Sequence, residues 1–328
     1  MWEFILRRIM LMIPTLFMVS VVSFMIIELP PGDYLTTYVA TLAASGDTVD
    51  QAQLEALKKR YALDQPVHVR YLKWIWNVLQ GDFGVSFEWN RPVKDLIWER
   101  LALTVIITFL ALVFAWTVGL VIGIYSATRQ YSFGDYFFTF LSFVGLGTPD
   151  FMIALILMWV AFSFFDTNIS GLFSEEFVDA PWSIERVIDL LKHLWVPMVI
   201  LGTSGTAGLV RTMRANLLDE LNKPYVETAR AKGLTESRVI FKYPVRVALN
   251  PFVSTIGWSL PQLISGSIII SVVLSLPTTG PLLLRALLAQ DMFLAASFVL
   301  MLSLLTIIGT LISDVLLALL DPRIRMGG

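Results

Sequence analysis

Few residues of this sequence belong to types that could do chemistry. There is no cysteine, which excludes a disulfide framework and a thiolate nucleophile. The only histidines, His68 and His193, stand far apart in the sequence, so a histidine-based metal site is not expected, although carboxylates could still bind a hard cation. No Gly-Lys pair occurs, so the chain lacks the Gly-x-x-x-x-Gly-Lys-Ser/Thr loop that cradles nucleotide phosphates. ATP hydrolysis, if it drives this protein, must come from other subunits.

Asp150 is the acidic residue with the most unusual surroundings. It lies about 14 residues into a long apolar stretch, or ~21 Å along an unbroken helix at 1.5 Å per residue. An acid at that depth of a membrane costs roughly 2.5–3.5 kcal/mol, so it marks a polar cavity or a partner group. The preceding Gly147-Thr148-Pro149 could open the helix and free carbonyl groups. Two interpretations stay open, a residue that lines a pathway and a structural hydrogen bond or ion pair.

The composition indicates that lipid surrounds most of the chain. Of its 328 residues, 56% are hydrophobic and 15% are charged, whereas soluble domains are about 45–50% apolar and about 25% charged. A soluble protein of this length would need more charged residues to cover its surface. The net charge of −2 also provides no basic field for nucleic acid.

Six stretches are apolar and long enough to be candidate membrane helices, given that a span takes roughly 20 residues. They are residues 9–29, 101–125, 136–165, 194–210, 247–276 and 292–320. The first is longer than the apolar region of a signal peptide and is interpreted as a retained anchor. The sequence therefore predicts an all-α membrane protein of about six transmembrane helices.

The distribution of charge predicts the orientation of these spans. Basic residues cluster before the first span, between the fourth and fifth spans and in the tail, and such residues favour the cytoplasmic side. They include Arg7, Arg8, Arg211, Arg214, Lys223, Arg230, Lys232, Arg238, Lys242, Arg246, Arg323 and Arg325. The loop 166–193 is acidic and falls outside. Both termini are then cytoplasmic, and the chain divides into the first span (1–29), an external segment (30–98) and a transmembrane domain (99–328) that contains a cytoplasmic segment (211–246).

The cytoplasmic segment predicts two short helices with a break between them. Pro224 suits the first turn of a helix, with Asn222 or Lys223 as its cap. Gly233 is placed to end that helix in a left-handed conformation. Thr235 can cap the second helix. From these features alone, a plain solvated loop remains the alternative interpretation.

The residues of the first short helix carry a resemblance to a known family. The run Glu227-Thr228-Ala229-Arg-Ala-Lys-Gly233 resembles the Glu-Ala-Ala-x-x-x-Gly motif of ABC importer permeases. The resemblance implies a coupling helix that docks in a groove of a cytoplasmic ATPase, with Glu227, Thr228, Ala229, Gly233 and Leu234 as its site residues. Thr228 replaces the first alanine of the motif. The end of the motif is also altered, because Leu249-Asn250-Pro251 comes late, which favours the peptide-type branch.

The external segment extends this resemblance over nearly the whole chain. Residues 48–61 are expected to form an amphipathic helix, and a second helix holds Tyr71, Trp74 and Trp76. Leu-Asp-Gln-Pro, Gly-Asp-Phe-Gly, Arg-Pro-Val and the terminal Asp-Pro-Arg-Ile-Arg then look like the dipeptide/oligopeptide/nickel family of ABC permeases. They stand at 63–66, 81–84, 91–93 and 321–325. The resemblance implies the type I permease fold and docking of a periplasmic solute-binding protein.

Three polar residues are candidates for lining a translocation pathway, namely Asp150, Asn250 and Gln262. Asn250 and Gln262 lie in the fifth span, which prolines and glycines should kink. Gly202, Gly205 and Gly208 recur at three-residue spacing in the fourth span and are interpreted mainly as a tight packing stripe.

The sequence thus predicts a permease subunit of an ATP-driven importer in a bacterial-type inner membrane. Six spans are few for a solute path, so a homologous second permease is expected, with two ATPase subunits and a binding protein. The chain itself is expected to bind no cofactor and no metal. Peptides are the first expectation for the substrate, oligosaccharides are the alternative, and nickel is disfavoured. An ion-coupled secondary transporter or an intramembrane enzyme that uses Asp150 are the rival classes.

Overall fold

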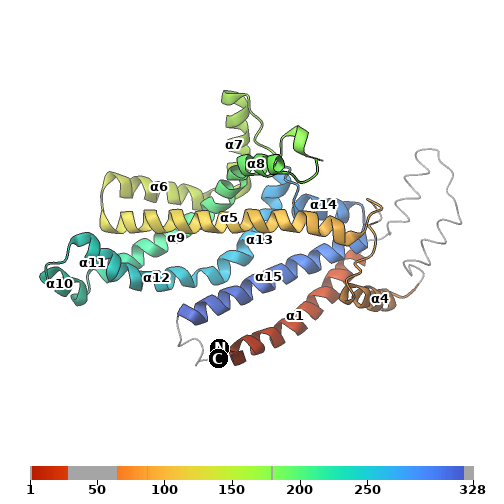
Figure 1. The fold of residues 1–328 in the computed structure, drawn as a ribbon, viewed down its shortest axis with the longest axis horizontal. Helices are drawn as coiled ribbons and strands as arrows, with labels where there is room; N and C mark the ends of the chain where they lie inside the picture. The colour runs from red at the N-terminus through yellow and green to blue at the C-terminus, as the bar shows by residue number, and fades with distance from the viewer. Residues whose placement is uncertain (1, 29–64, 87, 179, 321–328) are drawn as a thin grey trace. The chain divides into compact units, whose positions relative to one another are not determined.

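The computed structural model describes residues 2–28, 65–86, 88–178 and 180–320, and this part of the chain is helical (Figure 1). The α-helices are α1 (Trp2–Glu28), α4 (Val67–Leu79), α5 (Val93–Thr128), α6 (Phe133–Gly147), α7 (Asp150–Phe165), α8 (Ile184–His193), α9 (Trp195–Leu221), α10 (Pro224–Ala231), α11 (Glu236–Lys242), α12 (Pro244–Ser254), α13 (Ile256–Val273), α14 (Thr279–Leu288) and α15 (Met292–Leu320). A short 3-10 turn, η1, covers Glu175–Phe177. The prediction of an all-α protein is confirmed. The helix predicted at 48–61 and the tail motif at 321–325 lie outside the described residues.

The chain forms two compact units. The first unit comprises Met1–Ile5, Thr104–Leu276 and Ile308–Gly328, and the second comprises Leu6–Leu103 and Pro277–Ile307. The helices α1, α5 and α15 each contribute to both units. The sequence instead predicts boundaries after residues 29 and 98, which separate segments by the side of the membrane on which they are expected. Because the two compact units are defined by contacts, they do not test this division, and it stays a prediction. Its second boundary falls inside α5, which begins at Val93.

The described residues contain three single helices long and apolar enough to cross a membrane, within α1, α5 and α15. Two bent pairs raise this number to five if each pair is one span, namely α6 with α7 and the two halves of 184–221. The fifth predicted span, 247–276, is divided between α12 and α13, and only Gln262–Val273 appears there as a short apolar helix. Pro251 lies inside α12, where a proline removes a backbone donor and weakens the helix.

The third predicted span is not a straight helix. The axes of α6 and α7 differ in direction by 108° across the two residues between them. Thr148 has an extended backbone, with φ −106° and ψ 123°, which is the conformation that a following proline favours. Asp150 is therefore the first residue of α7, so a distance measured along an unbroken helix does not apply to it, and its depth in the membrane stays a prediction.

The fourth predicted span continues well beyond residue 210. The helix α9 runs to Leu221, so Arg211 and Arg214 lie on a helix rather than in a loop. Its second half packs on α5 and α12 through buried side chains. This cluster consists of Ala115, Ala127, Leu209, Met213, Leu217, Val245, Ala248 and Phe252. The cytoplasmic segment predicted at 211–246 thus begins inside a packed helix.

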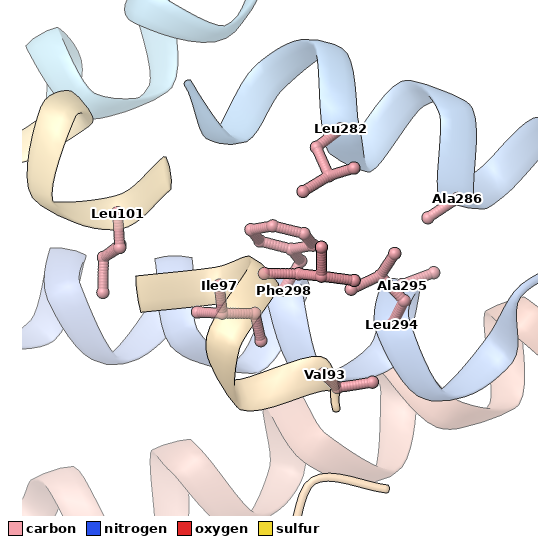
Figure 2. Close-up of a cluster of buried hydrophobic side chains, with 9 residues drawn as sticks. Val93, Ile97, Leu101, Leu282, Ala286, Leu294, Ala295 and Phe298 are labelled. Carbon is pink, nitrogen blue, oxygen red and sulfur yellow. The ribbon is translucent and has the colours of Figure 1, made fainter. Parts of the chain in front are cut away.

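The core of the second unit brings three segments together (Figure 2). Its buried residues are Val93, Leu96, Ile97 and Leu101 of α5, Leu282 and Ala286 of α14, and Leu294, Ala295 and Phe298 of α15. Phe298 has no exposed surface and is surrounded by side chains of all three helices. Buried Asp291, just before α15, accepts hydrogen bonds from Ser86 Oγ (2.5 Å) and the Glu88 amide (3.2 Å). This carboxylate holds the loop that follows the Gly-Asp-Phe-Gly motif.

Replacement of Phe298 with alanine should destabilise the second unit. Truncation of a buried phenylalanine typically costs about 3–5 kcal/mol, because the cavity left behind collapses only in part. We expect the apparent melting temperature of the detergent-solubilised protein to fall by roughly 5–10 °C. Phe133→Ala is the matched control, because Phe133 is 86% exposed. Equal melting temperatures for the two variants would contradict the prediction.

Candidate functional site

The segment between α9 and α12 folds as two short helices around a glycine, as the sequence predicts. Lys223, rather than Asn222, is the N-cap of α10, and Pro224 is its first residue. Gly233 has a φ of +76°, and its amide donates to the Arg230 carbonyl at 2.9 Å. Thr235 is the N-cap of α11, but its side chain makes no capping hydrogen bond. The left-handed glycine therefore sets the direction in which α11 leaves α10.

The inner face of this segment joins the two helices. Val226 and Ala229 of α10 and Val239 of α11 form a buried cluster, with partly buried Leu234 and Tyr243 packed against it. Of the five residues predicted to form the coupling site, Ala229 and Leu234 thus point inward. Their contacts hold α10 and α11 together as one small body.

The outer face carries the other predicted residues. Glu227, Thr228 and Gly233 are exposed. The Thr228 hydroxyl donates to the Pro224 carbonyl at 2.9 Å, so it is engaged within its own helix. Glu227 lies in the first turn of α10, where a negative charge is favourable. Glu227 therefore offers a solvent-facing charge on a stiff support.

Two side-chain contacts brace the segment. The Arg230 guanidinium reaches across the turn to Glu236, with Nη2 2.7 Å from Oε1. This hydrogen bond lowers the pKa of Glu236, so the pair stabilises the turn above the ordinary glutamate pKa and is lost as the pH falls through the lowered value. The contribution is small because both groups are exposed. The Tyr225 hydroxyl donates to Glu220 Oε2 of α9 at 2.6 Å, and burial followed by this bond raises the pKa of Tyr225 to about 12.

A second candidate site is a cavity of about 640 Å³ within the first unit, which we call the polar cavity after the polar residues on its otherwise largely apolar wall. Residues of α5, the α6–α7 break, α9, and the region from Thr255 to Gly266 line it. Its polar lining residues are Thr148, Asp150, Arg211, Thr212, Thr255, Ser259 and Gln262. The structure therefore brings the predicted pathway residues Asp150 and Gln262 to one cavity. Asn250 is exposed on α12 and is not among the lining residues.

The sequence interpretation missed Arg211 as a cavity residue, because the fourth span was expected to end at residue 210. If the helix of the fourth span is continued past residue 210, Gly205, Gly208 and Arg211 recur at three-residue spacing and share one helix face. This spacing is the signal that could have found Arg211. The glycine stripe itself has two roles. A Cβ on Gly202 would clash with Phe114 of α5, which confirms tight packing there, whereas Gly205 and Gly208 line the cavity.

Together these features define a class of protein. The chain is an all-helical, multi-pass membrane protein with a polar cavity among its helices and a braced, exposed helix pair between two of them. These are the features of a membrane transport subunit.

Comparison with known proteins gives the family. Residues 119–326 match the model of the binding-protein-dependent transport system inner membrane component, and residues 1–108 match the model of the N-terminal part of such membrane components. The chain belongs to this family of inner-membrane permeases. The prediction of a transport subunit that is not itself an ATPase is thereby confirmed. In such systems a partner ATPase hydrolyses ATP, and a binding protein is a further partner.

Relatives of known description match the chain over almost its full length. It is 36% identical to the oligopeptide transport system permease protein AppB of Bacillus subtilis, over 99% of this chain and 100% of that protein. It is 33% identical to the glutathione transport system permease protein GsiC of Salmonella paratyphi A. It is 32% identical to the dipeptide transport system permease protein DppB of Escherichia coli K12. Each of the last two matches covers 99% of both chains.

Proposed function

We propose that this chain and a second, homologous permease form the translocation pathway of an ATP-driven importer of peptides. The observation that carries the choice of substrate is the full-length similarity to permeases described for oligopeptides, dipeptides and glutathione. All three substrates are short peptides or peptide-like molecules. Oligosaccharides are the alternative, and the scarcity of histidine and the lack of cysteine still disfavour nickel.

The remaining partners follow from the same proposal. Two ATPase subunits bind on the cytoplasmic side, a periplasmic binding protein docks outside, and both termini lie in the cytoplasm. The α10–α11 segment is the contact with the ATPase. What supports this role is its architecture, because a buried apolar joint, an ion pair across the turn and the Tyr225–Glu220 bond make it stiff enough to act as a lever.

The polar cavity is proposed as this chain's part of the pathway. Asp150 and Gln262 line it together with Arg211, so the cavity offers both charges and an amide to a polar solute. Asp150 also stands in the first turn of α7, where the helix dipole favours a carboxylate. No observation supports the same role for Asn250.

The proposal is tested by reconstituting the permease pair with the ATPase and the binding protein in proteoliposomes. Uptake of a labelled dipeptide should require the binding protein and ATP, and it should stop when the phosphate-binding lysine of the ATPase is replaced. Ligand binding by the cognate binding protein then separates peptides from oligosaccharides. Transport by this chain alone on an ion gradient would overturn the proposal in favour of a secondary transporter.

Loss of the Asp150 charge should slow uptake without uncoupling ATP hydrolysis. A polar contact to the solute is worth about 0.5–1.5 kcal/mol, or 1.5–3 when it is charged, so we expect Asp150→Asn to reduce the uptake rate roughly tenfold. Gln262→Leu, at another lining residue of the cavity, should reduce it about fivefold by the same reasoning. Initial uptake rates and ATPase rates check both. Unchanged uptake in both variants would remove the cavity from the pathway.

A further inference from the structure

An ion pair between the buried carboxylate of Asp135 and the partly exposed guanidinium of Arg214 joins α6 to α9 in the first unit and has no part in the sites described above. Asp135 is 2% exposed and receives two hydrogen bonds from one guanidinium. Arg214 Nε lies 3.0 Å from Asp135 Oδ1, and Arg214 Nη2 lies 2.9 Å from Asp135 Oδ2. The Tyr131 amide donates a further bond to the same carboxylate at 3.0 Å. A two-pronged contact of this kind fixes orientation as well as distance.

The pair stands where movement of the coupling segment would enter the helices. Asp135 belongs to the first turn of α6. Arg214 lies about two turns before the end of α9, after which only Asn222 and Lys223 precede α10. The Tyr225–Glu220 bond ties α10 back to the last turn of α9. A displacement of α10 therefore reaches Arg214 through one short stretch of helix.

Close packing joins α6 to α9 a second time, about three turns further along α6. A Cβ on buried Gly145 would lie 3.3 Å from Thr203 Cγ2 and 3.8 Å from Ala207 Cβ, both on α9. Because α6 is held near both of its ends, it should follow α9 as a rigid body. Directly beyond Gly145 are the 108° break and Asp150, which line the polar cavity.

We propose that the Asp135–Arg214 pair is a positioning contact that transmits displacement of α10, through α9 and α6, to the broken corner of the polar cavity. The inference rests on the proposed docking of α10–α11 on the ATPase. A buried ion pair is weak evidence for stability, because apolar side chains of similar volume often hold helices together as well. Its particular property is a fixed relative orientation, which a lever requires.

The test compares Asp135→Asn and Arg214→Lys in the complete importer reconstituted in proteoliposomes. The first variant removes one charge, whereas the second keeps the charge and loses the two-pronged geometry. Loss of the charge or of the two-pronged geometry leaves a buried polar group without a well-placed hydrogen-bond partner. We therefore expect uptake per ATP hydrolysed to fall roughly tenfold or more. Assembly with the ATPase and the basal ATPase rate should hold. Asp219→Asn, an exposed carboxylate on the same helix, should keep the wild-type ratio.

A second arm restores the contact without charges. The chain has no cysteine, so Asp135→Cys with Arg214→Cys provides the only two thiols of this chain for a short bifunctional maleimide. We expect the untreated double variant to be uncoupled and the cross-linked one to regain most of its uptake per ATP. Wild-type uptake per ATP in the single variants, or no recovery of uptake per ATP after cross-linking, would overturn this inference and leave the proposed function standing. A wild-type complex without ATP-dependent uptake would overturn the proposed function, and this inference with it.

Discussion

Gly233→Val should abolish most ATP-coupled uptake while the chain still inserts in the membrane. Gly233 has a φ of +76°, which a β-branched residue adopts only at a cost of about 1–2 kcal/mol or more. A Cβ at this position would meet no atom within 4 Å, so the cost lies in the backbone rather than in a clash. The turn relieves this strain by moving toward a negative φ, which changes the angle between α10 and α11.

The backbone origin of this effect gives it a graded signature. Asparagine tolerates the left-handed region better than alanine, and alanine better than valine, so uptake per ATP should rank Gly233→Asn above Gly233→Ala above Gly233→Val. Lys232→Ala is the matched control, because Lys232 has an ordinary φ of −75° and is exposed. Uptake and ATPase rates in proteoliposomes measure the ranking. If valine matches asparagine, the left-handed turn does not matter for coupling.

Glu227→Lys should uncouple uptake from ATP hydrolysis because it reverses a charge, and not because it changes the backbone. Glu227 is exposed in the first turn of α10, where its interaction with the helix dipole is worth about 0.3–1 kcal/mol. The helix itself should therefore survive the change. A charge buried by a docked partner costs about 2–5 kcal/mol when it is removed. We expect uptake to fall by roughly 30-fold or more, together with weaker co-purification of the ATPase.

Two further variants show whether the effect belongs to this position. Glu227→Gln should lie between wild type and Glu227→Lys, because it removes the charge without reversing it. Asp219→Asn neutralises an exposed carboxylate on α9 and should change neither uptake nor co-purification. Wild-type coupling in Glu227→Lys would show that the outer face of α10 does not contact the ATPase through this residue.

Features that depend on neighbouring residues were predictable from the sequence. Pro224 and Gly233 predict a helix, a left-handed stop and a second helix, and the structure has them because each signal acts within one turn of backbone. The apolar character of α1, α5 and α15 follows from composition over some 20 residues. Thr148-Pro149 predicts a possible opening of the third span, since a proline restricts the residue before it. The size of the bend, 108°, could not be predicted from these two residues, because it depends on how the surrounding helices pack.

The sequence by itself therefore determined that the chain is an all-helical membrane protein and that it carries a short helix pair with the family's motif. The tertiary structure alone decided which residues meet. Asp135 and Arg214 are 79 positions apart, yet they form an ion pair, and Ala229 of the motif points inward against Val239. Arg211 joins Asp150 and Gln262 at one cavity, whereas Asn250 does not. The physical reason is that helix periodicity assigns a residue to a face of its own helix, while the partner of that face depends on how distant helices pack.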